Sequence, residues 1–307
     1  MEVLKPIHTE ILKENVEEFD LIPDGVKSIF APNFWKKGNR GKGIKIAIID
    51  TGCDINHKDI KDRIVDTRNF TNENRADKKD VTDYDGHGTH VAGIIAASGN
   101  NGGIVGVAPK AELFILKALT EKGGTYNWII KAINYAIEKK VDIINMSFGG
   151  KYDSQQLHYA IKRAIANNIL VVAAAGNDGD GEETTNEINY PAAYNEVISV
   201  GSIKYNNDES RFSSSNDEVD LVAPGQGING RGIISLAPKN KYMELIGTSM
   251  AAPHVTGALA LIKNWAKEYF NRELTEEELY AQLIKKTKSL GYSPKIEGNG
   301  VLDLSIN

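Results

Sequence analysis

Short apolar runs rich in β-branched residues recur along the chain, and segments with helical periodicity lie between them. The strand-like runs cover residues 44–49, 113–117, 141–146, 169–175 and 197–203. The helical segments include residues 87–97, 126–138 and 155–166. Strands that alternate with helices of this length form right-handed βαβ units. The pattern therefore predicts an α/β fold with a parallel sheet, in one main domain without internal repeats.

One segment near the C-terminus lacks a polar face altogether. The octapeptide 247–254, Gly-Thr-Ser-Met-Ala-Ala-Pro-His, leads into an apolar run over residues 255–262. A helix that is apolar on every side belongs in a core. We therefore expect a loop that delivers Ser249 to the N-terminus of a buried helix, where unpaired N–H groups and the helix dipole favour an oxyanion. From these residues alone, Ser249 is either a nucleophile or a helix cap.

The pattern of alternating strands and helices is weaker in the rest of the chain. Short strands are expected near residues 219–222 and 232–236, and an amphipathic helix near 275–286. The polar stretch 66–83 predicts a long surface loop. Residues 1–20 are acidic and weakly periodic, with four apolar side chains available for one helical face: Ile11, Leu12, Val16 and Phe19. We interpret this segment as an appendage outside the main domain, and a frayed arm is the alternative.

Composition narrows the class of protein. The chain has 307 residues, 41% of them hydrophobic and 25% charged, with a net charge of -5. An acidic chain without a Lys/Arg cluster is not expected to bind nucleic acid. No apolar run is long enough to span a bilayer, so no membrane partner is expected. The N-terminus lacks the regions of a secretory signal and Cys53 is the only cysteine, which together favour a cytoplasmic protein.

Polar residues with catalytic potential follow the predicted strands. Asp50 ends the first strand, His87 opens a small-residue helix, and Asn177 follows the strand at 169–175. Sites in open parallel sheets form at the carboxyl ends of strands. Taken singly, Asp50 and Asn177 could be turn residues and His87 a core histidine. Together with Ser249 they make a Ser-His-Asp triad with an oxyanion donor.

The three triad residues lie in three sequence blocks: Asp50-Thr51-Gly52, residues 87–93 (His-Gly-Thr-His-Val-Ala-Gly) and the octapeptide 247–254. The blocks resemble the signatures of subtilisin-type serine proteases (peptidase family S8), in that family's order, over about residues 20–305. Ala252 stands where the family often has a second serine, a position that is not catalytic. The resemblance implies a three-layer fold, with helices on both faces of a mostly parallel sheet.

The same resemblance implies the roles. Ser249 would attack the peptide carbonyl while His87 acts as general base and then general acid, and Asp50 would orient the imidazole. Asn177 and the Ser249 backbone N–H would bind the oxyanion. His90 and His254 are expected to be structural.

The resemblance also implies a cleft for polypeptide substrates. One edge would be Ser147, Phe148 and Gly149, and the other Lys122, Gly123 and Gly124. The extended substrate would add as a strand between them. The P1 pocket would be lined by Ala174, the backbone up to Gly176, and Asn189, with Asp178 at its rim, where it could admit a basic P1 residue. Tyr126 would help to line the P4 pocket.

A calcium site is a further implication of the resemblance. The loop 98–104 has the length of the family's calcium loop, with Asn100 as a side-chain ligand and carbonyl ligands from Ser98, Gly102 and Ile104. Asp59 would supply a bidentate carboxylate and Asp20 a ligand near the mature N-terminus. Hard oxygen ligands of mixed type suit Ca²⁺, although the loop could also be a bare polar turn. A weaker cation site would use the carbonyls of Ala192, Tyr194 and Val197, with Asp220.

If Asp20 lies near the mature start, residues 1–17 form an N-terminal extension and residues 18–307 the catalytic domain. The extension resembles the inhibitory segment of the intracellular subtilisins, with Leu4-Lys5-Pro6-Ile7 as a partial match to its motif. We therefore expect an intracellular serine endopeptidase of broad specificity, used in protein turnover. A narrow processing (leader) peptidase and a catalytically silent peptide-binding module are the alternatives, and a homodimer is left open.

Overall fold

The computed structural model describes residues 3–6, 10–16 and 21–306. Within these residues the largest sheet has nine strands in the order β14-β15-β11-β10-β9-β7-β3-β5-β4. Neighbouring strands run parallel except for β14 and β15 at one edge. The strands are β3 (Lys45–Asp50), β4 (Ile64–Asn69), β5 (Glu112–Lys117), β7 (Ile143–Met146), β9 (Leu170–Ala174), β10 (Ile198–Lys204), β11 (Leu221–Gln226), β14 (Thr287–Lys288) and β15 (Val301–Leu302).

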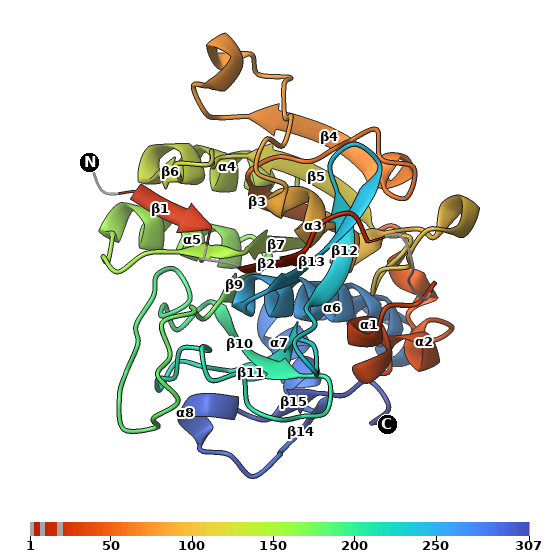
Figure 1. Cartoon of the computed structure of the whole chain (residues 1–307), viewed down its shortest axis with the longest axis vertical. Helices are drawn as coiled ribbons and strands as arrows, with labels where there is room; N and C mark the ends of the chain where they lie inside the picture. Colours follow the sequence, from red (N-terminus) through yellow and green to blue (C-terminus); the bar gives the residue numbers. More distant parts are fainter. Residues whose placement is uncertain (1–2, 7–9, 17–20, 307) are drawn as a thin grey trace.

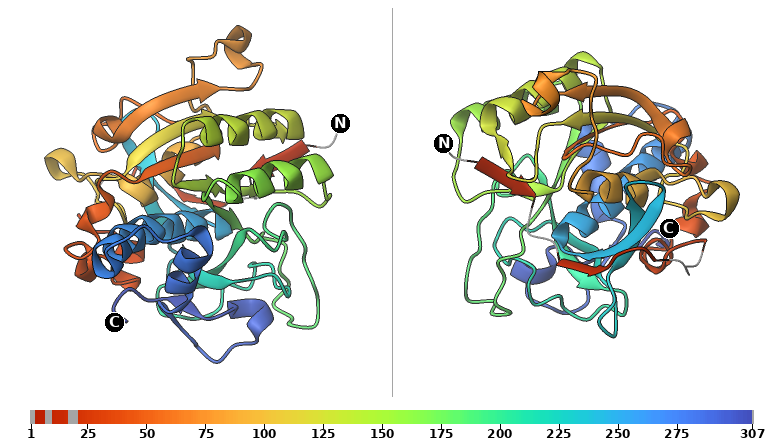
Figure 2. Two further views of the ribbon diagram at one scale, coloured as in Figure 1. Left: turned by 180° about the vertical axis from the view of Figure 1, so that it is seen from behind. Right: turned by 45° about the horizontal axis from the view of Figure 1, so that its top comes forward.

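Helices cover both faces of this sheet (Figures 1 and 2). One core holds α3 (His87–Ala96) and α6 (Thr248–Phe270), and the other holds α4 (Tyr126–Glu138) and α5 (Gln155–Ile165). Strand β3 contributes side chains to both cores, because Ile46 and Ile48 face the first while Ala47 and Ile49 face the second. This alternation is what a strand buried on both sides requires. The predicted three-layer α/β fold is confirmed.

Shorter elements complete the described chain. The amphipathic helix expected near 275–286 is α7 (Glu276–Ile284), which starts with a capping box between Thr275 and Glu278. The remaining helical turns are α1 (Asp24–Ser28), α2 (Ala31–Phe34), η1 (Asn39–Gly41), η2 (Lys61–Arg63), η3 (Glu73–Ala76), η4 (Asn100–Gly102) and α8 (Pro294–Glu297). No helix in residues 3–6, 10–16 and 21–306 is long and apolar enough to cross a membrane.

The predicted surface loop at 66–83 is wrong at its start. Strand β4 occupies residues 64–69 and pairs with β5 at the sheet edge. Its side chains are mostly half-buried, so the run lacks the apolar signature of the central strands. An edge strand pairs with a neighbour on one side only, and polar side chains are compatible with that position.

The helical face proposed for the N-terminal segment is also wrong where the structure describes it. Residues Val3–Pro6 form β1 and Glu10–Lys13 form β2. Strand β1 lies between β6 (Gly124–Thr125) and β8 (Phe148–Gly149), and β2 adds to the hairpin of β12 (Ile233–Ala237) and β13 (Lys241–Ile246). Figure 1 shows β1, in red, beside β6. We call residues 3–6 and 10–16 the arm; Phe19 lies outside the described residues.

Candidate active site

Asp50 and His87 meet where β3 ends and α3 begins. Asp50 is the last residue of β3 and His87 the first of α3. Asp50 Oδ1 lies 2.7 Å from His87 Nδ1, and both side chains are 1% exposed. The Thr51 N–H donates to the same carboxylate oxygen at 2.7 Å. Since a carboxylate can only accept, His87 carries a proton on Nδ1 and its Nε2 is the nitrogen that can accept one.

Asp83 holds this arrangement in place, and the sequence analysis missed it. Its Oδ1 accepts from Thr51 Oγ1 at 2.8 Å, and its Oδ2 accepts from Thr89 N at 2.8 Å and Oγ1 at 2.6 Å. Asp83 therefore ties the end of β3 to the first turn of α3. An aspartate just before a helix start is the signal that could have identified it, because such residues cap helix N–H groups.

Of the three histidines His87, His90 and His254, the electrostatics favour His87 as a base. Burial acts to lower the pKa of His87, but the charge and hydrogen bond of Asp50 outweigh it and raise the pKa above its usual 6.5. Burial, with His87 nearby, lowers the pKa of His90 to about 3, and burial lowers that of His254 to about 4. His90 Nε2 faces the Ile233 carbonyl at 3.0 Å, and His254 Nδ1 the Met250 carbonyl at 2.8 Å. Both stay neutral and packed, as expected of structural histidines.

Ser249 lies in the first turn of α6 and is fully buried. Pro253 has no N–H, so the Ser249 carbonyl lacks its usual helical donor. Ser147 Oγ supplies one at 3.1 Å, and Ser249 Oγ donates in return to the Ser147 carbonyl at 2.9 Å. His87 Nε2 is buried without a hydrogen-bond partner among the described residues. Catalytic hydrogen bonds often form only when substrate is bound.

Asn177 follows β9 and is oriented by α6. Its Oδ1 accepts from Thr248 N at 2.9 Å and from Thr248 Oγ1 at 2.8 Å. The amide oxygen is thereby engaged, and the amide nitrogen is the end that can donate to a ligand. Gly176 permits this loop, because its φ is 125° and a Cβ there would lie 2.1 Å from Asn189 Nδ2.

Comparison with known proteins identifies the class. The model of the subtilase family matches residues 41–300. The chain is 55% identical over 297 residues to an intracellular serine protease of Paenibacillus polymyxa, covering 96% of this chain and 89% of that protein. It is 52% identical over 297 residues to the major intracellular serine protease of Bacillus subtilis (strain 168), covering 96% and 92%. Subtilisin E of that strain is 39% identical over 256 residues, covering 83% and 64%.

The chain belongs to the subtilase family. It is a serine endopeptidase of the subtilisin type, and its predicted kinship with the intracellular subtilisins is confirmed.

In this subtilase the predicted substrate cleft already contains a strand. Val3 and Leu4 of β1 pair with Thr125 and Gly124, while Lys5 and Pro6 pair with Gly149 and Phe148. Leu4 is 1% exposed and packs in the same core as Phe148. Gly123 lies close to the Leu4 carbonyl, because a Cβ on Gly123 would be 2.5 Å from that oxygen. The two predicted edges thus lie on either side of the arm.

The residues expected around the P1 and P4 pockets lie at the end of β9, in the loop after it and at the start of α4. Ala174 ends β9 and is buried beside Gly176. Asn189 Nδ2 donates to Asp178 Oδ2 at 3.0 Å, and the same oxygen lies 2.7 Å from Lys151 Nζ. Tyr126 opens α4, packs against the core that contains Leu4, and donates to the Tyr152 carbonyl at 2.8 Å. Lys122 is exposed at the tip of its turn and has no pairing with β1 among the described residues.

The predicted calcium loop is built around a buried carboxylate. Asp59 Oδ2 accepts from Tyr242 OH at 2.8 Å and from Ile104 N at 3.1 Å, whereas Oδ1 is buried without a hydrogen-bond partner. Ser98 Oγ donates to the Asp59 carbonyl, and Asn100 Nδ2 donates to the Lys58 carbonyl at 3.2 Å, so the amide oxygen of Asn100 is the end that a cation could bind. An orphaned carboxylate oxygen beside a loop of carbonyls fits a hard cation. Asp20 lies outside the described residues.

The weaker cation site predicted at Ala192, Tyr194, Val197 and Asp220 has no carboxylate oxygen that is buried without a hydrogen-bond partner. The Tyr194 carbonyl accepts from Val197 N at 2.8 Å, and Asp220 accepts from Ser199 N at 2.8 Å and from Tyr280 OH at 2.5 Å. Its other member, Ala192, is buried beside these residues in the α4–α5 core. Across the described part of the chain, no group of three His, Cys, Asp or Glu side chains is placed to hold a metal ion.

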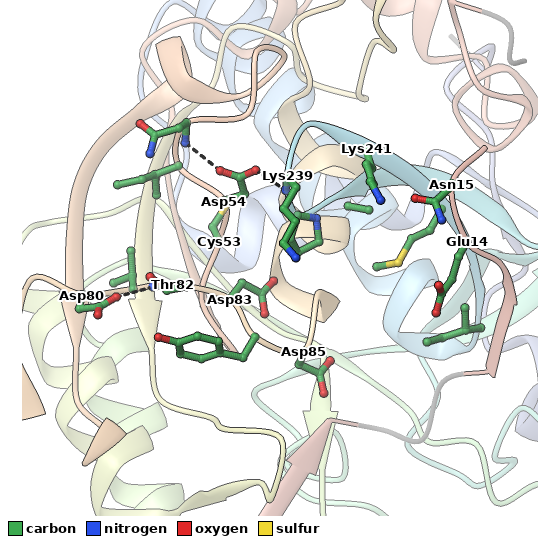
Figure 3. Close-up of a pocket in the computed structure, with 18 of the residues that line it drawn as sticks. Glu14, Asn15, Cys53, Asp54, Asp80, Thr82, Asp83, Asp85, Lys239 and Lys241 are labelled. Atoms are coloured by element: carbon green, nitrogen blue, oxygen red, sulfur yellow. Dashed lines mark hydrogen bonds between the residues drawn. The ribbon is translucent and has the colours of Figure 1, made fainter. Parts of the chain in front are cut away.

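A cavity of about 760 Å³ lies beside the site (Figure 3). Asp83 and Asp85 form one wall, and Glu14 and Asn15 of the arm lie on the opposite side. None of the predicted substrate-binding residues lines it. Cys53 also faces this cavity; burial, with the charge of Asp83, raises the pKa of its thiol, so it is an unreactive small residue.

Proposed function

We propose that this protein hydrolyses peptide bonds through an acyl-enzyme on Ser249. Ser249 Oγ attacks the carbonyl carbon while His87 Nε2 accepts its proton, and the protonated His87 then returns that proton to the departing amine. Water then attacks the resulting ester while His87 accepts a proton from it. His87 returns this proton to Ser249 Oγ, which releases the acid and restores the serine. Asp50 holds the imidazole with its proton on Nδ1 and stabilises the imidazolium.

The oxyanion of each tetrahedral intermediate would receive two donors, the Asn177 side-chain amide and the Ser249 backbone N–H at the start of α6. In subtilisin, loss of the corresponding asparagine costs roughly 10²–10³ in kcat. The observation that supports the proposal most strongly is the buried 2.7 Å contact between Asp50 and His87. Asn177 is in turn hydrogen-bonded to Thr248, the residue before Ser249.

The arm is proposed to inhibit the enzyme. It pairs with both edges of the cleft at residues 3–6, in the antiparallel manner in which an extended substrate would add. Asp50, His87 and Ser249 are each 1% exposed or less in this arrangement. A substrate would therefore need the arm to leave, and residues 1–17 would act as an inhibitory propeptide of a catalytic domain that spans residues 18–307.

The names of the relatives support a proposal for the role in the cell. Two proteins that match 96% of this chain are named intracellular serine proteases, so we propose an intracellular, cytoplasmic protease of protein turnover. Broad specificity is favoured because the cleft edges bind backbone, and Gly124 and Gly149 carry no side chain that selects a partner. Ca²⁺ held by Asp59, Asn100 and the carbonyls of 98–104 would stabilise the loop; its chemistry is structural charge compensation.

One experiment tests nucleophile, activity and calcium together. Casein hydrolysis is measured for the full chain and for Ser249→Ala, each with and without EDTA. We expect hydrolysis by the wild type, none by Ser249→Ala, and a loss of wild-type activity on heating with EDTA. Equal hydrolysis by both proteins would refute the assigned nucleophile.

A further inference from the structure

Two loops meet beside the end of β1 and carry opposite charges. Lys151 comes two residues after Gly149, which pairs with Lys5 of the arm. Asp178 comes directly after Asn177, the residue bound to Thr248 at the start of α6. Gly150 is bonded in both directions to Tyr190, next to Asn189. A peptide in the place of the arm would therefore reach Ser249 between these loops.

The charges form a bridge between the loops. Lys151 Nζ lies 2.7 Å from Asp178 Oδ2, and Asn189 Nδ2 donates to the same oxygen at 3.0 Å. Asn189 is buried, whereas the side chains of Lys151 and Asp178 are 52% and 50% exposed. Partial burial acts to raise the pKa of Asp178, but the bonds from Lys151 and Asn189 hold it below its ordinary value. The carboxylate is thus ionised and already matched by a cation.

We propose that Lys151 is a specificity-determining residue, which occupies Asp178 and makes the rim of the P1 pocket electrically neutral. The inference rests on the proposed function, because it assumes that substrate takes the place of the arm. It differs from the expectation that Asp178 could admit a basic P1 residue. A P1 arginine or lysine would have to displace Lys151, and a P1 glutamate would have to displace Asp178.

The preferred substrates are therefore peptides with an uncharged P1 side chain. The wall residues Ala174 and Gly176 and the amide of Asn189 suit apolar and mildly polar groups. An exposed ion pair contributes little to stability, so the bridge can be removed from either side without unfolding the chain. Its effect on a charged ligand is Coulombic and falls with salt, because the Debye length shortens from about 10 Å at 0.1 M to about 3 Å at 1 M.

The test compares full-chain Lys151→Gln, Asp178→Asn and wild type on tetrapeptide anilides that differ only at P1, with Leu, Arg or Glu. Rates are taken once the progress curves are linear. Lys110→Gln is the matched control, since this exposed lysine precedes β5 at the opposite end of the sheet. At low salt we expect Lys151→Gln to raise the Arg/Leu ratio of kcat/KM about fivefold, and Asp178→Asn to raise the Glu/Leu ratio by a similar factor.

Both increases should vanish in 1 M NaCl, and the control should match the wild type. Hydrolysis of the Leu peptide with unchanged ratios in both variants would overturn the role of Lys151 and leave the protease intact. Increases that persist at high salt would also overturn it, since they would indicate a change of pocket shape. If no protein cleaves any peptide and Ser249 does not react with a phosphonofluoridate, the proposed function fails and this inference falls with it.

Discussion

At the scale of single residues, His87 is governed by two opposing effects, burial and the Asp50 charge. Burial favours the neutral ring and Asp50 favours the imidazolium, and Asp50 prevails because its oxygen lies 2.7 Å from Nδ1 in a site that excludes water. The same burial without a carboxylate partner drives His90 and His254 in the opposite direction. The charge partner, more than burial, distinguishes the base from the structural histidines.

This balance predicts a pH dependence. Activity needs neutral His87, so kcat/KM should rise with pH through a pKa above 6.5. Asp50→Asn removes the largest effect that opposes burial and leaves only the charges of Asp85 and Asp83, so the pKa of His87 should fall, and kcat should drop by about 10⁴. Titration of the His87 ring by NMR in both proteins measures the shift. An unchanged ring pKa in the asparagine variant would contradict the assigned pairing.

The candidate residues could be found from the sequence because strand ends are visible in it. The apolar run before Asp50 and the run before Asn177 stop at those residues, and parallel strands bring their carboxyl ends together. The role of Asp83 could not be predicted from strand ends in the same way. Its role depends on Thr51 and Thr89 reaching it at once, and such convergence follows from the packing of α3 on β3.

At the scale of elements, the start of α6 depends on a proline. Pro253 frees the Ser249 carbonyl, and Ser147 at the end of β7 fills the gap while its own carbonyl receives Ser249 Oγ. Asn145 supports this contact, because its amide donates to Ser147 Oγ at 3.0 Å and its oxygen accepts from Thr256 Oγ1 at 2.8 Å. The nucleophile is thereby held between a helix and a neighbouring strand.

Ser147→Ala should therefore lower the free energy of unfolding by about 1–3 kcal/mol, because it leaves a buried carbonyl unpaired. Adding Pro253→Ala should restore part of that loss, since an alanine N–H at residue 253 can bond to the Ser249 carbonyl. Urea unfolding of the two single variants and the double variant measures the coupling. Strictly additive losses would indicate that the carbonyl was satisfied in another way.

The elements that the sequence misses share one property. β2 and β4 are edge strands and β1 is a four-residue strand between two others; most of their residues are exposed or half-buried, so they carry little apolar signal. The partners of β1 and β2 lie more than 100 residues away in the chain, and no local pattern encodes such a pairing. The central strands can be predicted from the sequence because both of their faces are buried, which makes them continuous apolar runs.

At the scale of the whole molecule, the arm pairs with two separate sheets, through β1 with β6 and β8 and through β2 with β13. Its anchor in the cleft is Leu4, 1% exposed, while neighbouring Val3 is 40% exposed. Closure by the arm is intramolecular, so its effective concentration is high and does not depend on dilution.

Leu4→Ala should weaken arm binding by about 2–5 kcal/mol, as expected for a buried leucine, and raise the initial rate of the full chain. Val3→Ala is the matched control and should behave as the wild type. Deletion of residues 1–17 should give the highest initial rate. Identical progress curves for all four proteins would remove the inhibitory role of the arm.

The proposed Ca²⁺ would act at the same scale, because Asp59 connects the 98–104 loop to Tyr242 in β13. Ca²⁺ at 100 times its Kd would add about 2.7 kcal/mol to the free energy of unfolding. Asp59→Asn should abolish the calcium dependence of Tm, and Asp217→Asn, at an exposed position, should keep it. A wild-type Tm that does not respond to Ca²⁺ or EDTA would contradict this site.

The central claim is that Ser249 is the nucleophile activated by His87 and Asp50. Its most direct test is reaction with a phosphonofluoridate, followed by intact mass and peptide mapping, in the full chain, Leu4→Ala and His87→Ala. We predict one adduct per chain on Ser249, formed faster in Leu4→Ala and at least about 10³-fold more slowly in His87→Ala. No adduct in either the full chain or Leu4→Ala, or an adduct on another residue, would contradict the claim.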